Sequence, residues 1–295
     1  MSTTAQESPL REIHAEMKGV AQRLRLPFRR HSWKGLAGNW LGVGIGSSID
    51  FQDHRPYLPG DDPRYIDWQA YARTGNYTMK LYREEVSPRV DIILDTSPSM
   101  SLTGAKRKRT LELLYFTIES ALLCHSSLRI VGVRGNKVED LPLQLFLGYR
   151  WDLDAKPEAS LDACPAFTRA AVRHGSMRIL ISDLLFPGAP DEFMRVLRSR
   201  RGRGVVLAPY LESESSPSWE GNVELVDCEQ GVSRKQRVVP EIHRKYVGAY
   251  RRHFDLWTSQ ARTYDVILAR VSADLPFFDS MQHEALRTGA VETWS

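Results

Sequence analysis

The sequence predicts an α/β fold with a mostly parallel central sheet and helices on both of its faces. From Val90 to the end of the chain, short apolar runs alternate with longer stretches in which apolar residues recur every three or four positions. This alternation of strands and helices is typical of parallel sheets that are covered on both sides. The 295 residues are 42% hydrophobic, which is enough for a large buried core.

The first 87 residues lack this alternation. Ser8 and Pro9 resemble an N-cap and the first position of a helix that ends near Pro27. Its apolar stripe consists of Leu10, Ile13, Met17, Val20 and Leu24. Residues 35–63 are rich in glycine and proline and favour irregular structure, whereas residues 78–84 alternate like a half-buried strand. We therefore expect residues 1–87 to form a helix and an irregular or β segment, packed on an α/β domain of residues 88–295.

The pattern within residues 88–295 gives each expected element. Strands are expected at residues 90–94, 128–133, 177–182, 205–211, 223–226 and 265–271. Helices are expected around residues 111–123, 161–172, 191–201 and 240–261. Asp95 and Asp183 each stand directly after an expected strand. Because ligands of such sheets bind beyond the carboxyl ends of the strands, these two carboxylates are the first candidates for a site.

Charge and cysteine content exclude several classes of protein. The net charge of +4, from 40 basic and 36 acidic residues, is too small to indicate a nucleic-acid binder. The three cysteines form no Cys-x-x-Cys pair, which argues against a zinc ribbon or a disulfide framework. No apolar run reaches the roughly 18 residues of a membrane span, and the first residues lack the apolar core of a secretion signal. We expect a cytoplasmic protein with buried, reduced thiols, no membrane span and no nucleic-acid partner.

The loop after the first of these strands is the strongest candidate for chemistry. Asp95, Ser97 and Ser99 offer one carboxylate and two hydroxyls on one side of a tight turn. Mg²⁺ favours oxygen ligands in near-octahedral geometry and usually keeps several waters. The same residues also serve as ordinary helix caps. The residues alone therefore leave a metal site and a capping motif as alternatives.

The sequence Asp95-x-Ser97-x-Ser99-Met100 resembles the metal-ion-dependent adhesion site of von Willebrand factor A domains, and Ile181-Ser182-Asp183 resembles its third segment. The resemblance implies a Rossmann-like fold and a divalent cation, Mg²⁺ or else Mn²⁺ or Ca²⁺. It also implies that Asp95, Ser97, Ser99 and Asp183 bind this cation, Asp183 directly or through water. The family's second segment supplies a threonine. Ser160 is the corresponding hydroxyl here, and Thr168 is a weaker candidate.

A narrower resemblance covers almost the whole chain. The segment ahead of the metal loop resembles the signature of the bacterial domain-of-unknown-function-58 family. It reads Gly46-x5-Phe51-Gln52-Asp53-His54-Arg55-Pro56-Tyr57-x-Pro59-Gly60-Asp61-Asp62-x-Arg64-x-Ile66-Asp67-Trp68. Residues 71–74 and 223–231 resemble the same family. The resemblance implies a partnership with a MoxR-type AAA+ ATPase and its client, as an adaptor or chaperone component.

Two further clusters of charge have simpler interpretations. The basic runs at residues 106–109 and 198–203 are expected to be solvated helix faces, although an acidic partner or nucleic acid is the alternative. Asp61, Asp62 and Asp67, with Arg64 among them, favour turns and an arginine–aspartate network that locks the segment onto the body. The alternative there is a second carboxylate site for a metal or a partner.

The loop that carries Asp95, Ser97 and Ser99, called the serine loop below, favours binding over catalysis. No candidate base or nucleophile stands beside it, and an aspartyl-phosphate enzyme of the haloacid dehalogenase type needs an acid where Ser97 stands. We therefore predict a non-enzymatic, metal-dependent protein-binding module. The alternatives are a metal-dependent phosphoesterase or nuclease, and a scaffold whose metal site is vestigial.

Overall fold

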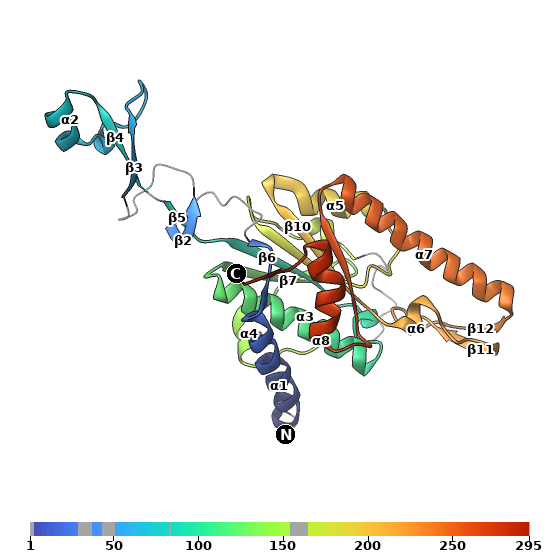
Figure 1. Cartoon of the computed structure of the whole chain (residues 1–295). Coiled ribbons are helices and arrows are strands. Elements are labelled where there is room, and N and C mark those ends of the chain that lie inside the picture. Colours follow the sequence, from blue (N-terminus) through green and yellow to red (C-terminus); the bar gives the residue numbers. More distant parts are fainter. Residues whose placement is uncertain (1–2, 29–36, 43–50, 83, 154–164, 295) are drawn as a thin grey trace. The chain divides into compact units, whose positions relative to one another are not determined.

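The computed structural model describes residues 3–28, 37–42, 51–82, 84–153 and 165–294 (Figure 1). The chain divides into two compact units. The larger unit contains residues 1–28, 89–124 and 128–295, and the smaller unit contains residues 29–88 and 125–127. Within the described ranges, no helix has the length and apolar character needed to cross a membrane.

A six-stranded sheet forms the centre of the larger unit. Its strands are β6 (Arg89–Asp95), β7 (Ser127–Arg134), β8 (Lys137–Asp140), β9 (Met177–Ile181), β10 (Arg203–Tyr210) and β13 (Ile267–Ser272). Their order is β8-β7-β6-β9-β10-β13. The pairs β6–β9, β9–β10 and β10–β13 are parallel, whereas β7–β8 is an antiparallel hairpin. The mixed α/β class with a mostly parallel sheet is therefore confirmed.

The strand order determines where a ligand crevice opens. Numbered by their sequence, the six strands run 3-2-1-4-5-6 across the sheet. The order reverses between β6 and β9, because the chain moves outward to one side of β6 and later returns to its other side. Crevices of doubly wound sheets open at such a reversal, beyond the carboxyl ends of the strands. Asp95 is the last residue of β6, and Asp183 follows β9, the two strands that flank this reversal.

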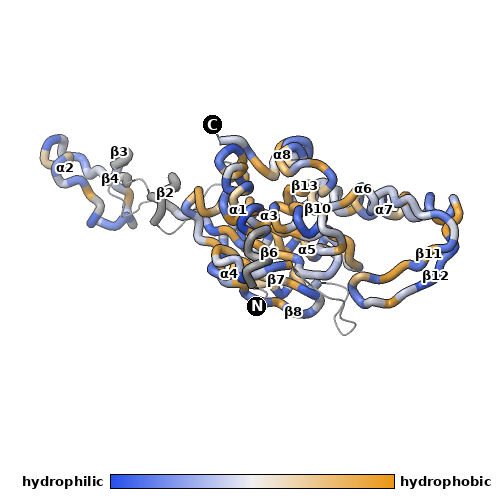
Figure 2. Tube along the Cα trace, turned by 90° about the horizontal axis from the view of Figure 1, so that it is seen from below, coloured by the Kyte–Doolittle hydropathy of each residue, from blue (hydrophilic) through white to orange (hydrophobic). Residues whose placement is uncertain are grey.

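Helices cover both faces of this sheet. The helices of the larger unit are α1 (Thr3–Ala21), α3 (Gly104–Leu123), α4 (Leu143–Leu147), α5 (Pro190–Arg198), α6 (Glu212–Ser215), α7 (Pro240–Thr263) and α8 (Phe277–Ser280), which a π-helical turn continues to Leu286. Ile93, Leu180 and Val206 point to the face where α5 and α7 lie. Hydrophobic residues accordingly concentrate in the strands and in the helices packed on them (Figure 2).

Helix α3 is buried on almost all sides, not on one. It contacts β6, β9 and β10 on one side, and α1 packs on its other side. Leu113 and Phe116 are therefore as buried as Leu114 and Ile118. The sequence pattern cannot reveal this, because the residues that cover the outer side of α3 lie about 100 positions earlier in the chain.

The N-terminal helix differs from expectation at its start. It begins at Thr3, so Ser8 is not its N-cap and Pro9 lies inside it. The apolar stripe packs on α3, where the His14 ring stacks on Tyr115 and its Nε2 donates to Glu119 Oε1 at 2.6 Å. This helix thus belongs to the larger unit. Residues 29–88, which follow it in sequence, form most of the smaller unit.

Two other expected elements are also different. A helix was expected over residues 161–172. Of these, 161–164 lie outside the described residues, and the rest contain only a 3₁₀ turn at Phe167–Arg169. The expected strand at 223–226 is β11 (Gly221–Val226), which pairs with β12 (Ser233–Val238) as a separate hairpin. A further short pair, β1 (Leu24–Arg25) with β14 (Glu292–Thr293), was not foreseen.

The smaller unit contains more regular structure than its glycine and proline content suggests. Strand β3 (Phe51–Pro56) pairs with β4 (Thr78–Tyr82), and β2 (Ala37–Gly42) pairs with β5 (Glu84–Val86). Between β3 and β4 lie a 3₁₀ turn at Pro63–Tyr65 and α2 (Trp68–Thr74). Residues 35–63 are thus β structure in part.

Replacing Gly202 by alanine is expected to destabilise the sheet by about 1–3 kcal/mol. A Cβ at this position would lie 2.3 Å from Cζ of Arg178. Arg178 is fully buried and donates to the carbonyls of Val196 and Leu197, so its guanidinium has no room to move. Urea denaturation measures the loss. Gly19→Ala, in α1 with nothing within 4 Å, is the control and should be neutral or stabilising; equal effects of the two changes would contradict this account.

Candidate functional site

The serine loop begins with a carboxylate that is fully buried at the end of β6. Asp95 is 1% exposed. Its Oδ1 accepts the backbone N–H of Ser97 at 3.0 Å, and its Oδ2 accepts the hydroxyl of Ser182 at 2.6 Å. The chain then enters a 3₁₀ turn at Pro98–Ser101, which brings the Ser97 and Ser99 hydroxyl oxygens to 3.0 Å from each other. The first three predicted site residues thus lie together.

Asp183 meets the serine loop from the end of β9. Its Oδ1 accepts the backbone N–H of Leu185 at 3.0 Å, and its Oδ2 accepts a hydrogen bond from Lys106 Nζ at 2.8 Å. The next residue, Leu184, has a φ of 61°, which is strained for a leucine. Such strain persists only where the surrounding structure enforces it, here on the loop that holds Asp183.

Lys106 is the residue that the sequence interpretation missed. We expected residues 106–109 to form a solvated face, but Lys106 is 0% exposed and donates from Nζ to both Asp183 and Glu214. Arg109 is also buried, in an ion pair with Glu112. The apolar stripe of Leu111, Leu114 and Ile118 did not signal this burial, because Lys106 lies on another side of α3, in line with Leu113 and Thr117.

A cavity of about 510 Å³ opens over these residues. Its described lining contains five carboxyl groups and one ammonium group. The carboxyl groups belong to Asp95, Asp183, Glu214, Asp227 and Glu229, and the ammonium group is that of Lys106. Glu229, from the turn between β11 and β12, accepts the backbone N–H of Ser99 at 3.0 Å. The cavity therefore carries a marked excess of negative charge.

The pKa shifts reflect this crowding of carboxylates. Burial, and then the charge of Asp183, raise the pKa of Asp95 to about 7, although bonds from Ser182 and Ser97 oppose the rise. Burial lowers the pKa of Lys106, but Asp183 and Glu214 outweigh it and the net direction is upward. Burial also raises the pKa of Glu229, partly offset by its bonds to Ser99. The site thus favours additional positive charge.

The donors at the loop suit a small hard cation. Adjacent ligands of an octahedral Mg²⁺ at 2.0–2.1 Å are about 3 Å apart, which is the separation of the two serine oxygens. No three His, Cys, Asp or Glu side chains in the described ranges are grouped closely enough to hold a metal by themselves. A cation here would therefore depend on the hydroxyls of Ser97 and Ser99 together with Asp95.

Two hydroxyls were predicted to take the place of the family's threonine, those of Ser160 and Thr168. Ser160 lies outside the described residues. Thr168 is exposed in the 3₁₀ turn and is absent from the cavity lining. Cys228 contributes to the lining, and burial raises its pKa to about 11, which keeps it a neutral thiol.

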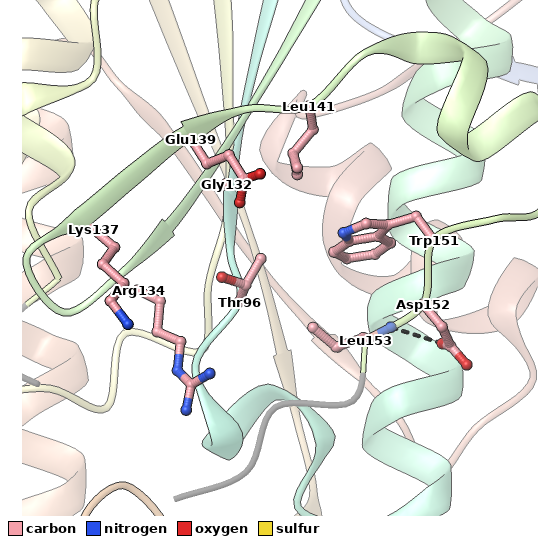
Figure 3. A pocket seen from close by; sticks show the side chains of 9 residues that line it. All are labelled: Thr96, Gly132, Arg134, Lys137, Glu139, Leu141, Trp151, Asp152 and Leu153. Carbon is pink, nitrogen blue, oxygen red and sulfur yellow. Dashed lines mark hydrogen bonds between the residues drawn. The ribbon is translucent and has the colours of Figure 1, made fainter. Parts of the chain in front are cut away.

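Thr96 separates this cavity from a second one. Its backbone N–H donates to the carbonyl of Val133 at 2.9 Å. Its side chain faces a cavity of about 240 Å³ that Arg134, Lys137 and Trp151 also line (Figure 3). Side chains therefore alternate along the loop, with Asp95, Ser97 and Ser99 on one side and Thr96 on the other, as the spacing predicts.

Asp61, Asp62 and Asp67, in the described part of the smaller unit, each bind a local partner and do not cluster around a shared metal position. Asp61 binds Arg55 through two hydrogen bonds of 2.6 and 2.8 Å, which lowers the pKa of Asp61 to about 2. Asp62 pairs with Arg64, and Asp67 caps α2 through the N–H groups of residues 69 and 70. Each carboxylate has its own local partner, so turn and cap chemistry accounts for this segment.

Comparisons with known proteins agree with the observed sequence features. The family described as "Protein of unknown function DUF58" matches residues 53–133. Two uncharacterized proteins of Mycobacterium tuberculosis and one of Mycobacterium bovis are each 25% identical over 234 residues, covering 74% of this chain and 73% of theirs.

A crystal structure of the conserved hypothetical protein BatB from Bacteroides thetaiotaomicron is 13% identical. It covers 60% of this chain and all of its own, with a TM-score of 0.31, so the description of the fold rests on the strand order alone. The chain is thus similar to the DUF58 family from the signature segment through the serine loop and β7.

Proposed function

We propose that the larger unit is a von Willebrand factor A-like domain that binds a protein through a divalent cation and is not an enzyme. The observation that supports this most is the excess of carboxylates around the two serine hydroxyls in the 510 Å³ cavity. Such a cavity repels an acidic partner in the absence of a cation and attracts one in its presence.

Each residue has a distinct task in this proposal. Asp95, Ser97 and Ser99 hold the cation, which is Mg²⁺ or else Mn²⁺ or Ca²⁺. Asp183 adds negative charge behind them, while Lys106 fixes its orientation. The bound cation supplies an open coordination position for a carboxylate of the partner. The exposed side chains of Leu102 and Leu185, at 53% and 38%, add apolar contact at the rim.

We propose a MoxR-type AAA+ ATPase and its client as the partners, by the resemblance of the serine loop and its preceding segment to the family. An affinity pull-down read by mass spectrometry tests this. The ATPase should be enriched with wild type and lost with Asp95→Ala. Equal recovery of the ATPase with wild type and with Asp95→Ala would show that its binding does not depend on the cation.

Metal addition is expected to stabilise the wild-type protein. A ligand at one hundred times its dissociation constant adds about 2.7 kcal/mol, because it binds only the folded state. Thermal melting after chelation and titration with MgCl₂ or MnCl₂ measures the effect. Asp95→Ala should abolish it, and Asp255→Ala, an exposed carboxylate of α7, should not. A flat wild-type response would count against the proposal.

The competing function is a metal-dependent phosphoesterase. The side chain two residues after Asp95 is a serine hydroxyl, which is a poor general acid. Turnover of phosphoesters by the purified protein, abolished by Asp95→Asn, would favour the enzyme over the binding module.

A further inference from the structure

The turn between β11 and β12 delivers a carboxylate of this chain to the serine loop. Glu229 lies 130 residues from Ser99 in sequence, yet its Oε1 accepts the Ser99 backbone N–H at 3.0 Å. Val226, Asp227 and Cys228 line the same cavity. A segment of the protein itself therefore occupies one side of the site.

The shape of this turn is set inside the hairpin. Asp227 Oδ1 accepts the N–H groups of Glu229 and Gln230 at 2.8 and 3.2 Å, and the Gly231 N–H donates to the Asp227 carbonyl at 2.8 Å. Gly231 has a φ of 72°, a conformation that favours glycine. Because these bonds are local, the form of the turn does not depend on its contact with Ser99.

The hairpin is anchored at its base more firmly than at its turn. At the base, His243 Nε2 donates to the Pro217 carbonyl at 2.6 Å, and the Trp219 and Tyr246 rings are 4.9 Å apart. At the turn, Val226 and Val232 are 64% and 60% exposed. The hairpin is also separate from the six-stranded sheet (Figure 1). Movement of the turn therefore breaks no strand pairing of the core.

We propose that Glu229 is an internal occupant of the serine loop, which the glutamate or aspartate of a partner segment replaces when the turn moves aside. The inference rests on the proposed function, since it concerns the regulation of that site. The replaced turn also indicates the partner's chemistry: an acidic residue close to a small aliphatic one, as Glu229 is close to Val226. Exposed Leu102 and Leu185 receive that aliphatic side chain.

Alkylation of Cys228 reports on the position of the turn without any metal. Cys228 is half-buried beside Glu229. In the full chain, Glu229→Ala should raise the rate of its modification by iodoacetamide about tenfold, read by peptide mapping. Glu229→Gln should give a smaller increase, because its amide oxygen still accepts the Ser99 N–H but without charge. Glu224→Ala, an exposed position on β11, is the control and should match wild type.

A peptide of residues 224–234 that carries Cys228→Ser tests whether Glu229 occupies the serine loop. Its affinity for the protein is measured in the presence of MnCl₂. It should bind Glu229→Ala about tenfold more tightly than wild type, whose own glutamate competes. The same peptide carrying Glu229→Gln should bind neither protein.

These measurements separate the inference from the function on which it rests. Unchanged alkylation, or equal peptide affinity in proteins that MnCl₂ stabilises, overturns the internal occupant alone. If MnCl₂ stabilises neither wild type nor any variant, the proposed function and the inference both fail.

Discussion

Lys106→Met is expected to destabilise the protein by about 3–5 kcal/mol, because it leaves buried carboxylates without their cation. Lys106 Nζ is 0% exposed and bonds to Asp183 and Glu214, whose side chains are 2% and 11% exposed. Methionine retains the length of the side chain but not its charge, so the loss measures electrostatics more than packing. Urea denaturation at pH 8 in a chelating buffer gives the difference.

Two further variants show whether the loss of stability in Lys106→Met comes from the buried charge. Lys108→Met, on the same helix but 57% exposed and 3.4 Å from its partner Glu112, should cost less than about 0.5 kcal/mol. Adding Asp183→Asn and Glu214→Gln to Lys106→Met should recover much of the stability, since no buried charge then lacks a partner. If the triple variant is no more stable than Lys106→Met, the role assigned to the ammonium group is wrong.

Asp95→Asn is expected to stabilise the metal-free protein at pH 8 and to remove its response to metal. The folded-state pKa of Asp95 is raised to about 7, and its ordinary unfolded value is about 3.9. Between these values the unfolded chain releases the proton while the folded protein retains it. The stability that the neutral carboxyl contributes is therefore full below about pH 4 and is lost as pH rises through about 7.

An asparagine does not ionise, so the free energy of unfolding of Asp95→Asn does not show this loss as the pH rises. In a chelating buffer the variant should exceed wild type by roughly 4 kcal/mol at pH 8, and the two should converge near pH 4. Saturating MgCl₂ should raise only the wild type. Denaturation curves from pH 4 to pH 8 test this, with Asp255→Asn as the control that keeps the wild-type profile. Parallel curves for Asp95→Asn and wild type would contradict the role of burial.

The sequence by itself predicted the features that depend only on residues close together in the chain. The alternation of apolar runs predicted the parallel strands, and the two-residue spacing of Asp95, Ser97 and Ser99 predicted that they share one side of a turn, apart from Thr96. The carboxyl ends of β6 and β9 were predicted as the site because each strand is followed by an aspartate. All of these are properties of short segments, which hydrophobic period and turn chemistry control.

Tertiary structure alone decided which groups surround the serine loop. Lys106 became an internal cation because β9 and α6 bring Asp183 and Glu214 to it, from 77 and 108 residues away. Glu229 reaches Ser99 across 130 residues because the β11–β12 hairpin stands outside the sheet. These charged side chains are distant in sequence but buried together in the folded protein. Because the surroundings have a low dielectric constant, the electrostatic interactions among them are stronger than they would be in water. The serine loop can be identified from the sequence, but the charged groups that surround it are brought together only by folding.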